Sequence, residues 1–145
     1  MATTSLTNNF RLNILNGVID LGDDTIKMAL YSGQSHNQNT TAYTTTGEVS
    51  SSGTNYTAKG NTLSGASQTT DTSNHVSYYD FNDTSWSSAT ITADSCLIYS
   101  DTVTSPTADV SIYVGDFGGS KSSSSGTFSV VFPAAAYNTS IIRIA

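Results

Sequence analysis

The chain has few of the residues from which surface helices are built. Among its 145 residues, Lys and Arg together number 5, and Glu occurs once, as Glu48. Ser and Thr make up about a third of the chain, and Tyr numbers 8. Long charged side chains favour helices, whereas β-branched Thr and aromatic Tyr favour strands. The composition therefore argues against a helical fold and predicts a protein of strands and turns.

Cysteine and basic residues are also scarce, and each scarcity excludes a class of protein. Cys96 is the only cysteine, so a disulfide within the chain is excluded, and we expect the thiol to pack as a small apolar group. The formal net charge is −6. Because binding a nucleic-acid backbone needs clustered Lys and Arg, this charge argues against a nucleic-acid partner.

Long apolar runs are missing as well. No stretch approaches 18 consecutive apolar residues, which argues against a membrane-spanning segment. The N-terminus has neither the basic start nor the apolar core of a signal peptide, so we expect no export by the usual signal. The length is most economically one domain, residues 1–145, with a short N-terminal arm of about residues 1–9.

One short helix is predicted near the start of the chain. Leu6, Phe10 and Ile14 fall at spacings of four, Thr7 or Asn8 can cap the first turn, and Asn16-Gly17 offers a stop. We expect this helix to pack across one end of a sheet.

Strands are predicted over most of the remaining chain. Thr25 to Tyr31 alternates, so that Ile26, Met28 and Leu30 face one way on a half-buried strand. Between Ser32 and Thr72 we expect long ordered loops with short strands, such as Glu48-Val49 and Asn55 to Ala58. Further strands are predicted at His75 to Phe81, Ala89 to Ala93, Ser95 to Tyr99, Asp109 to Val114, Thr127 to Phe132 and Ile141 to Ile144, separated by turns at Asn82-Asp83, Ser105-Pro106, Gly118-Gly119 and Ser122 to Ser125.

Many short strands without intervening helices predict the fold class. We expect an all-β protein: an antiparallel β-sandwich or jelly-roll-like domain with one short N-terminal helix.

Sequence fragments that resemble catalytic or metal-binding motifs lack the context that such chemistry needs. Gly115 to Ser122 comes within one residue of a phosphate loop but leads into a strand, so a hairpin loop is predicted. His36 and His75 stand in contexts that do not position a catalytic triad. Asp20, Asp23 and Asp24 do not match a calcium loop, and a role in a turn and strand entry is favoured. We therefore predict no enzyme and name no catalytic, cofactor-binding or metal-binding residue.

Two aromatic positions leave a binding role open. Tyr78-Tyr79 and Trp86 could form a stacking platform for sugars or a surface for a partner. On an alternating strand one tyrosine of the pair points inward, and Trp86 is about as well placed for the core. Four Asn-x-Ser/Thr triplets, beginning at Asn39, Asn55, Asn82 and Asn138, are attributed to chance in a chain so rich in Ser and Thr.

A set of segments spanning nearly the whole chain resembles a family of small virion proteins of tailed bacteriophages. The segments that carry the resemblance are Asn9 to Gly17, Asp24 to Tyr31, Gly47 to Val49, Gly53 to Gly60, Ala93 to Tyr99, Asp116 to Gly118, Gly126 to Val130, Phe132-Pro133 and Ile141 to Ala145. All of them are predicted strands, caps or turns, so the resemblance concerns the scaffold most directly.

The resemblance implies a non-enzymatic virion component. The first expectation is a capsid decoration, or cement, protein that is made in the host cytoplasm, binds the major capsid protein on the outer capsid surface and stabilises the shell. Such proteins usually act as homotrimers, and the N-terminal arm Ala2 to Asn9 could then add to a neighbouring subunit's sheet. The alternative is a tail, adaptor or fibre-associated protein, with glycan binding through an exposed Trp86 or Tyr79 as one form of it. Neither reading includes a cofactor, nucleic acid or a membrane.

Overall fold

The computed structural model describes residues 1–145, and its regular structure consists of antiparallel strands with one short helix. In chain order the elements are β1 (Ser5–Leu6), α1 (Asn8–Leu15), β2 (Ile26–Tyr31), β3 (Asn61–Thr62), β4 (Ser67–Asp71), β5 (Val76–Asp80), β6 (Thr84–Ala89), β7 (Thr92–Ser100), β8 (Ser111–Ser122), β9 (Gly126–Val130) and β10 (Ile142–Ile144). The predicted all-β, sandwich-like fold with an N-terminal helix is confirmed.

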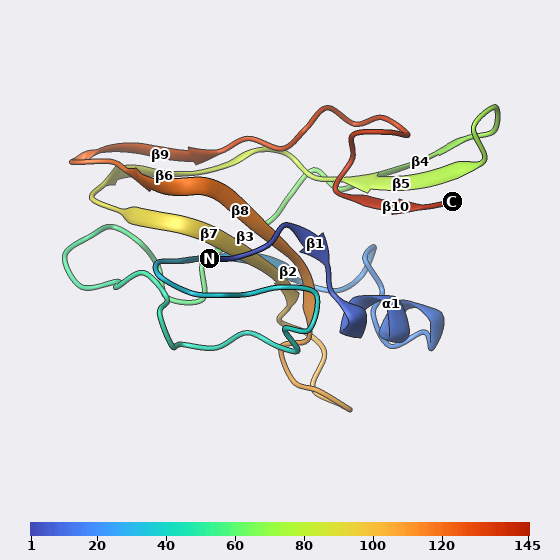
Figure 1. Ribbon diagram of the computed structural model, residues 1–145, viewed down its shortest axis with the longest axis horizontal. Helices are drawn as coiled ribbons and strands as arrows, with labels where there is room; N and C mark the ends of the chain where they lie inside the picture. Colours follow the sequence, from blue (N-terminus) through green and yellow to red (C-terminus); the bar gives the residue numbers. More distant parts are fainter.

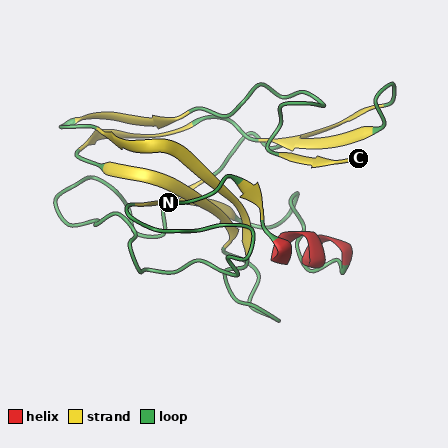
Figure 2. Cartoon of the chain, viewed as in Figure 1, coloured by secondary structure: helices red, strands yellow, loops and turns green.

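The strands form two layers. One layer is a five-stranded sheet of order β1-β8-β7-β2-β3. The other contains two smaller sheets, β6-β9 and β10-β5-β4, which lie beside each other above the first layer (Figures 1 and 2). Between the layers lies a core of 20 buried residues, to which the large sheet contributes Met28, Leu30 and Ile98 and the small sheets contribute Trp86 and Phe128, among others. The layers are therefore held together by burial of apolar side chains.

The predicted helix forms with the predicted caps. Thr7 is the N-cap, and its Oγ1 accepts a hydrogen bond from the Phe10 N–H at 3.2 Å. Asn16 is the C-cap, and Gly17 follows with φ +68°, a conformation that glycine adopts at little cost. Leu6, counted in the helical pattern, lies instead in β1. Phe10 is buried in the core and fixes the helix at one end of the large sheet.

The N-terminal arm predicted over residues 1–9 is instead docked on its own chain. Ala2 is buried, and the Thr3 N–H donates to the His36 carbonyl oxygen at 2.8 Å. Ser5 and Leu6 then pair with Val114 and Tyr113 as strand β1. In the single chain the segment therefore adds to its own sheet, because β8 offers it an unpaired edge within the same molecule.

Strand β2 is buried on both faces rather than half-buried. Ile26, Met28 and Leu30 face the core between the layers, as predicted. Ala29 and Tyr31 are also fully buried, in a second cluster on the opposite face of the sheet. The prediction failed because the segment of residues 32–60 crosses this outer face. The Ser32 N–H donates to Gly47, and the Val49 N–H donates to Leu30, so the segment is attached along β2.

Three predictions in the second half need correction. Gly118-Gly119 is not a turn: both glycines lie within β8, at positive φ, where the register with β7 shifts. Consequently the fragment Gly115 to Ser122 is strand rather than a hairpin loop. Ala89 to Ala93 is not one strand, because it contains the connection between β6 and β7, and the Ile91 N–H donates to the Ser123 carbonyl.

Strand β6 was not predicted, because half of its residues are Ser. Its alternation is nevertheless present, since Thr84 and Trp86 are buried while Ser85 and Ser87 are exposed. β6 pairs with β9, so β9 adds to the sheet opposite and does not form a hairpin with β8.

Candidate partner-binding surface

A polar cluster on the outer face of the large sheet is centred on the only glutamate. Oε1 of Glu48 accepts hydrogen bonds from the Tyr56 hydroxyl at 2.8 Å and from the Lys59 backbone N–H at 2.7 Å. Oε2 accepts a hydrogen bond from the Tyr43 hydroxyl at 2.5 Å. The Tyr56 hydroxyl in turn accepts a hydrogen bond from the Leu30 N–H of β2 at 3.1 Å. Both carboxylate oxygens therefore join parts of the 32–60 segment to one another, and the Tyr56 hydroxyl connects them to β2.

Charged side chains extend this cluster. Lys59 Nζ lies 2.7 Å from Asp101 Oδ1 and 3.4 Å from Asp109 Oδ2, and Lys27 Nζ lies 3.3 Å from Asp101 Oδ2. The hydrogen bond from Lys59 is the main cause that lowers the pKa of Asp101, and it likewise raises the pKa of Lys59. The ring of Tyr43 stacks on Tyr99 with centroids 4.9 Å apart. Together these contacts fasten one segment of the scaffold to another.

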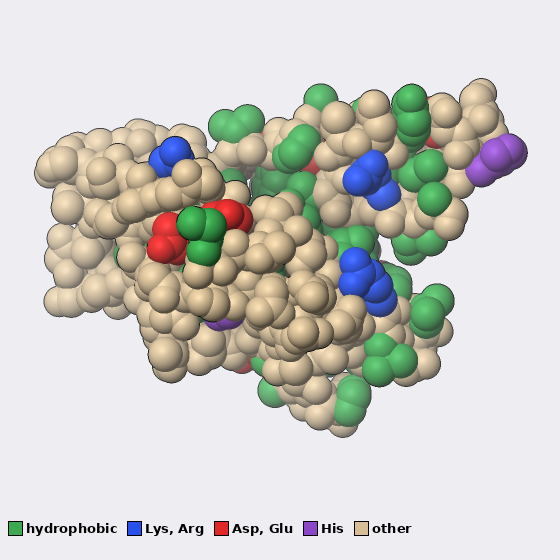
Figure 3. All heavy atoms as spheres, viewed as in Figure 1, with side chains coloured by type: hydrophobic (Ala, Val, Ile, Leu, Met, Phe, Trp, Pro, Cys, Tyr) green, Lys and Arg blue, Asp and Glu red, His purple; other side chains and the backbone are tan.

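The structure does not bring together the residues that were weighed for catalysis. The two histidine side chains, purple in Figure 3, lie well apart. His36 is buried with its ring edge-on to Tyr31, at 4.5 Å between centroids, and burial lowers its pKa. His75 is exposed, immediately before β5. The thiol of Cys96 is buried, as predicted, and burial raises its pKa to about 12.

The aspartates considered for calcium act within a turn, as predicted. Oδ1 of Asp20 accepts a hydrogen bond from the Gly22 N–H at 2.9 Å. Oδ2 of Asp24 accepts hydrogen bonds from the Asp20 N–H at 3.2 Å and the Ser100 hydroxyl at 3.0 Å. No group of three or more His, Cys, Asp or Glu side chains is arranged to hold a metal ion.

The aromatic platform expected for a glycan-binding protein is not formed by the residues named for it. Trp86 is 4 % exposed and Tyr79 is 8 % exposed, and both belong to the core. Tyr78 is partly exposed, so one tyrosine of the pair points inward, as predicted. Neither residue supplies the exposed aromatic that the glycan-binding alternative requires, because the small sheets that carry them pack against the large sheet.

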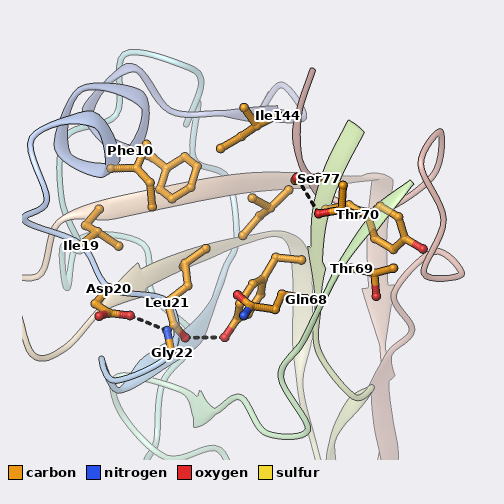
Figure 4. A pocket seen from close by; sticks show the side chains of 14 residues that line it. Phe10, Ile19, Asp20, Leu21, Gly22, Gln68, Thr69, Thr70, Ser77 and Ile144 are labelled. Atoms are coloured by element: carbon orange, nitrogen blue, oxygen red, sulfur yellow. Dashed lines mark hydrogen bonds between the residues drawn. The ribbon is translucent and has the colours of Figure 1, made fainter. Parts of the chain in front are cut away.

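A cleft of about 700 Å³ opens at the helical end of the molecule (Figure 4). Phe10 and Ile19 line it from the side of α1, Ile144 lines it from β10, and Gln68 and Thr70 line it from β4. Its wall at residues 20–22 is fixed by two hydrogen bonds, one from Gly22 to Asp20 and one from the Tyr79 hydroxyl to the Leu21 carbonyl at 2.5 Å. The cleft therefore has apolar walls and a hydroxyl-rich rim.

Exposed apolar side chains gather around this end. Leu15 of α1 is 85 % exposed, Leu12 is 57 % exposed, Ile144 of β10 is 56 % exposed, and Tyr137 is 41 % exposed. Figure 3 shows apolar side chains concentrated over α1 and the β10-β5-β4 sheet, whereas the opposite half of the same face is largely polar. We call α1, residues 16–24, the β10-β5-β4 sheet and residues 133–141 the open end. An exposed apolar patch rimmed by polar groups is typical of a protein-binding surface.

Sequence reasoning missed the open end, although part of its signal is local. Leu12 and Leu15 lie off the stripe formed by Phe10 and Ile14, so a helix that buries this stripe must expose them. The other half of the surface comes from β10, at the far end of the chain, and nothing local in the sequence joins it to α1.

No helix of the structure has the length and apolar character needed to cross a membrane. Comparison of the chain with protein-family models, with curated proteins and with solved structures gives no match in any of the three.

Proposed function

We propose that this chain is a bacteriophage capsid decoration protein that attaches to the outer shell through its open end. The observation that carries the proposal is the concentration of exposed Leu12, Leu15, Tyr137 and Ile144 at one end of an otherwise hydroxyl-rich surface. The resemblance of the sequence to small tailed-phage virion proteins supports the same conclusion. The partner of the open end is then the major capsid protein.

The rest of the molecule suits a protein that coats a shell. Two packed layers of sheet, with a loop segment fastened across one of them, give a stiff body. Ser and Thr side chains hydrate the exposed surface, and the net charge of −6 disfavours adhesion to packaged DNA. The open end can bury apolar area against the shell while the remaining surface stays in water.

The proposal includes assembly into a homotrimer around a three-fold position of the shell. Three copies would place three open ends on one set of capsid subunits, which multiplies a weak individual contact. Light scattering of the purified protein tests this part by itself. A trimeric mass is expected, and a monomer at all concentrations would remove the trimer from the proposal.

Copy number in the virion is the direct test. Quantitative mass spectrometry of purified virions, with the major capsid protein as the internal reference, should find this chain in near-stoichiometric amount. A small fraction would assign it to a tail, adaptor or vertex, and absence from the particle would refute a virion role.

A binding experiment then tests the open end. The double variant Leu15→Ser, Ile144→Ser should lose binding to particles that lack the protein, because it removes exposed apolar area. Val131→Ser is the matched control, since Val131 is 72 % exposed but lines a different hollow, between β8 and β9. Equal loss in both variants, or in neither, would contradict attachment through the open end.

A further inference from the structure

The only two arginines of the chain, Arg11 and Arg143, line one cleft. This cleft of about 500 Å³ is distinct from the one in Figure 4. Residues of β1 and α1 form one wall, and β10 with residues 133–141 forms the other. Figure 3 shows basic side chains, in blue, over α1 and over β10 on either side of a hollow. We call it the arginine cleft.

Alternation along β10 separates the two clefts. Ile142 and Ile144 line the cleft of Figure 4, whereas Ile141 and Arg143 line the arginine cleft. Successive side chains of a strand point to opposite faces. The sequence Ile-Ile-Arg-Ile therefore gives one short strand an apolar face and a face with a guanidinium group.

The arginines are not engaged by acidic side chains of their own chain. All three salt bridges of the molecule belong to lysines, two to Lys59 and one to Lys27. Arg11 donates to the Asn8 side-chain oxygen at 3.0 Å. No Asp or Glu lines the arginine cleft, and the last residue, Ala145, lines it without a salt bridge to either arginine. The site is therefore locally basic in a chain of net charge −6.

The walls of the cleft include two sheet edges. β1 is the last strand of the five-stranded sheet, and β10 is the last strand of its own sheet. Each therefore has an outer edge that pairs with no strand, and such edges present backbone donors and acceptors to an extended peptide. Leu6, Val76 and Tyr113 add apolar contact area in the same cleft.

We propose that the arginine cleft binds an extended acidic peptide segment of a partner protein. Carboxylates of the segment pair with Arg11 and Arg143, and its backbone runs along the edge of β1 or β10. Arginine suits this role because its planar guanidinium group can bind a carboxylate with two parallel hydrogen bonds. The inference goes beyond attachment to a capsid, since it specifies the chemistry of a second contact and does not depend on where the protein resides.

A labelled peptide of alternating Asp and Val residues tests the proposal by fluorescence anisotropy with the full chain. The same peptide with Asn in place of Asp is the control ligand. We expect the Asp peptide to bind and the Asn peptide to bind at least about fivefold more weakly. Equal affinities, or no binding by the Asp peptide, would overturn the proposal.

Three protein variants locate the site, each with one positive charge removed. Arg11→Gln and Arg143→Gln should each weaken binding of the Asp peptide by about three- to tenfold, with a smaller salt dependence. Lys121→Gln is the matched control, because Lys121 is exposed on β8 and lies outside the arginine cleft. Equal weakening by all three variants would show attraction by overall charge and overturn the assignment.

Two further measurements locate the bound peptide without relying on a variant that must fold, and test whether a second copy of the chain occupies the cleft instead. Chemical-shift mapping of the wild-type chain with the Asp peptide should move amide signals of β1 and β10, and shifts confined elsewhere would refute the site. Self-association that both arginine substitutions abolish would assign the cleft to a second copy and overturn the proposal. The virion copy number does not enter these measurements, so the capsid proposal and this one fail separately.

Discussion

The outer face of the large sheet and the open end use the same restricted composition in opposite ways. On the outer face, Glu48 accepts hydrogen bonds from the hydroxyls of Tyr43 and Tyr56, and Lys59 forms a salt bridge with Asp101. These contacts hold a long segment that has almost no regular structure of its own. At the open end, leucines are exposed and both arginines lack acidic partners within the chain. The charged side chains of the outer face are therefore paired within the chain and stabilise it, whereas the arginines of the open end remain available for recognition.

The largest expected effect on stability is at Gly60, where the 32–60 segment meets β2. Gly60 has φ +75°, and an added methyl group would overlap the Met28 carbonyl. Gly60→Ala should lower the free energy of unfolding by at least about 3 kcal/mol, measured by chemical denaturation. Gly53→Ala is the matched control, since Gly53 has φ +71° with open space around it. It should cost only about 1 kcal/mol, the strain of a left-handed backbone; equal costs would disprove the close approach at Gly60.

Removal of the Glu48 carboxylate should have the next largest effect. Glu48→Ala leaves the hydroxyls of Tyr43 and Tyr56 and the Lys59 N–H without their acceptor. We expect a loss of about 2 kcal/mol, because unpaired buried donors are costly and water can reach part of this cluster. Glu48→Gln keeps one acceptor and should lose less. Hydrogen exchange should show faster exchange within residues 43–59, and an unchanged pattern would mean that the segment is held by other contacts.

Thr7 joins the two regions, because it caps α1 and contacts β8. Its hydroxyl is fully buried, donates to the Ser111 carbonyl at 2.9 Å and accepts from the Phe10 N–H. Thr7→Ala should cost about 1 to 2 kcal/mol in denaturation experiments, the usual range for loss of a cap. Thr7→Ser keeps the hydroxyl and serves as the control. If the two variants are equally destabilised, the methyl group rather than the cap carries the effect.

How much of this comparison could be predicted depends on how local each signal is. The helix with its Thr7 cap and the core face of β2 follow from spacing and were predicted. The burial of the other face of β2 could not be, because it depends on contacts such as Glu48 with Tyr56 within a loop that has no apolar period. Strand β6 was missed because Ser fills its outward positions, and β8 was cut short because Gly118-Gly119 is usually a turn signal.

The candidate site was harder to predict for the same reason. Arg11 and Arg143 stand near opposite ends of the sequence, and only the placement of β10 beside α1 and β1 brings them to one cleft. Trp86 and Tyr79, for which a surface role was left open, are in the core because the strands that carry them pack against the large sheet. Residue type indicated what each side chain can do, but burial decided which of them are available.

Acid should weaken the outer face of the large sheet. The pKa of Asp101 is lowered from its ordinary value of 3.8, chiefly by the hydrogen bond from Lys59. A carboxyl whose pKa is lower in the folded state stabilises the fold above its unfolded pKa and loses this contribution as pH falls through the folded pKa. The contribution is therefore present above pH 3.8 and is lost below it. Asp101→Asn should reduce this part of the acid dependence by less than about 1 kcal/mol, since the pair is partly exposed. Unfolding curves on both sides of that pH measure it, and an unchanged acid dependence would exclude Asp101 as its source.

The smallest effect on stability is expected at Leu15, and it separates the two regions most sharply. Leu15 is 85 % exposed at the last turn of α1, so Leu15→Ser removes little buried area and should change the free energy of unfolding by less than about 0.5 kcal/mol. A cluster of exposed apolar residues that contributes little to folding is typical of a partner-binding surface. A marked loss of stability would instead place Leu15 in the scaffold and remove it from the open end. A stable Leu15→Ser variant that fails to bind particles would show that recognition at this end is independent of the stability held at the outer face.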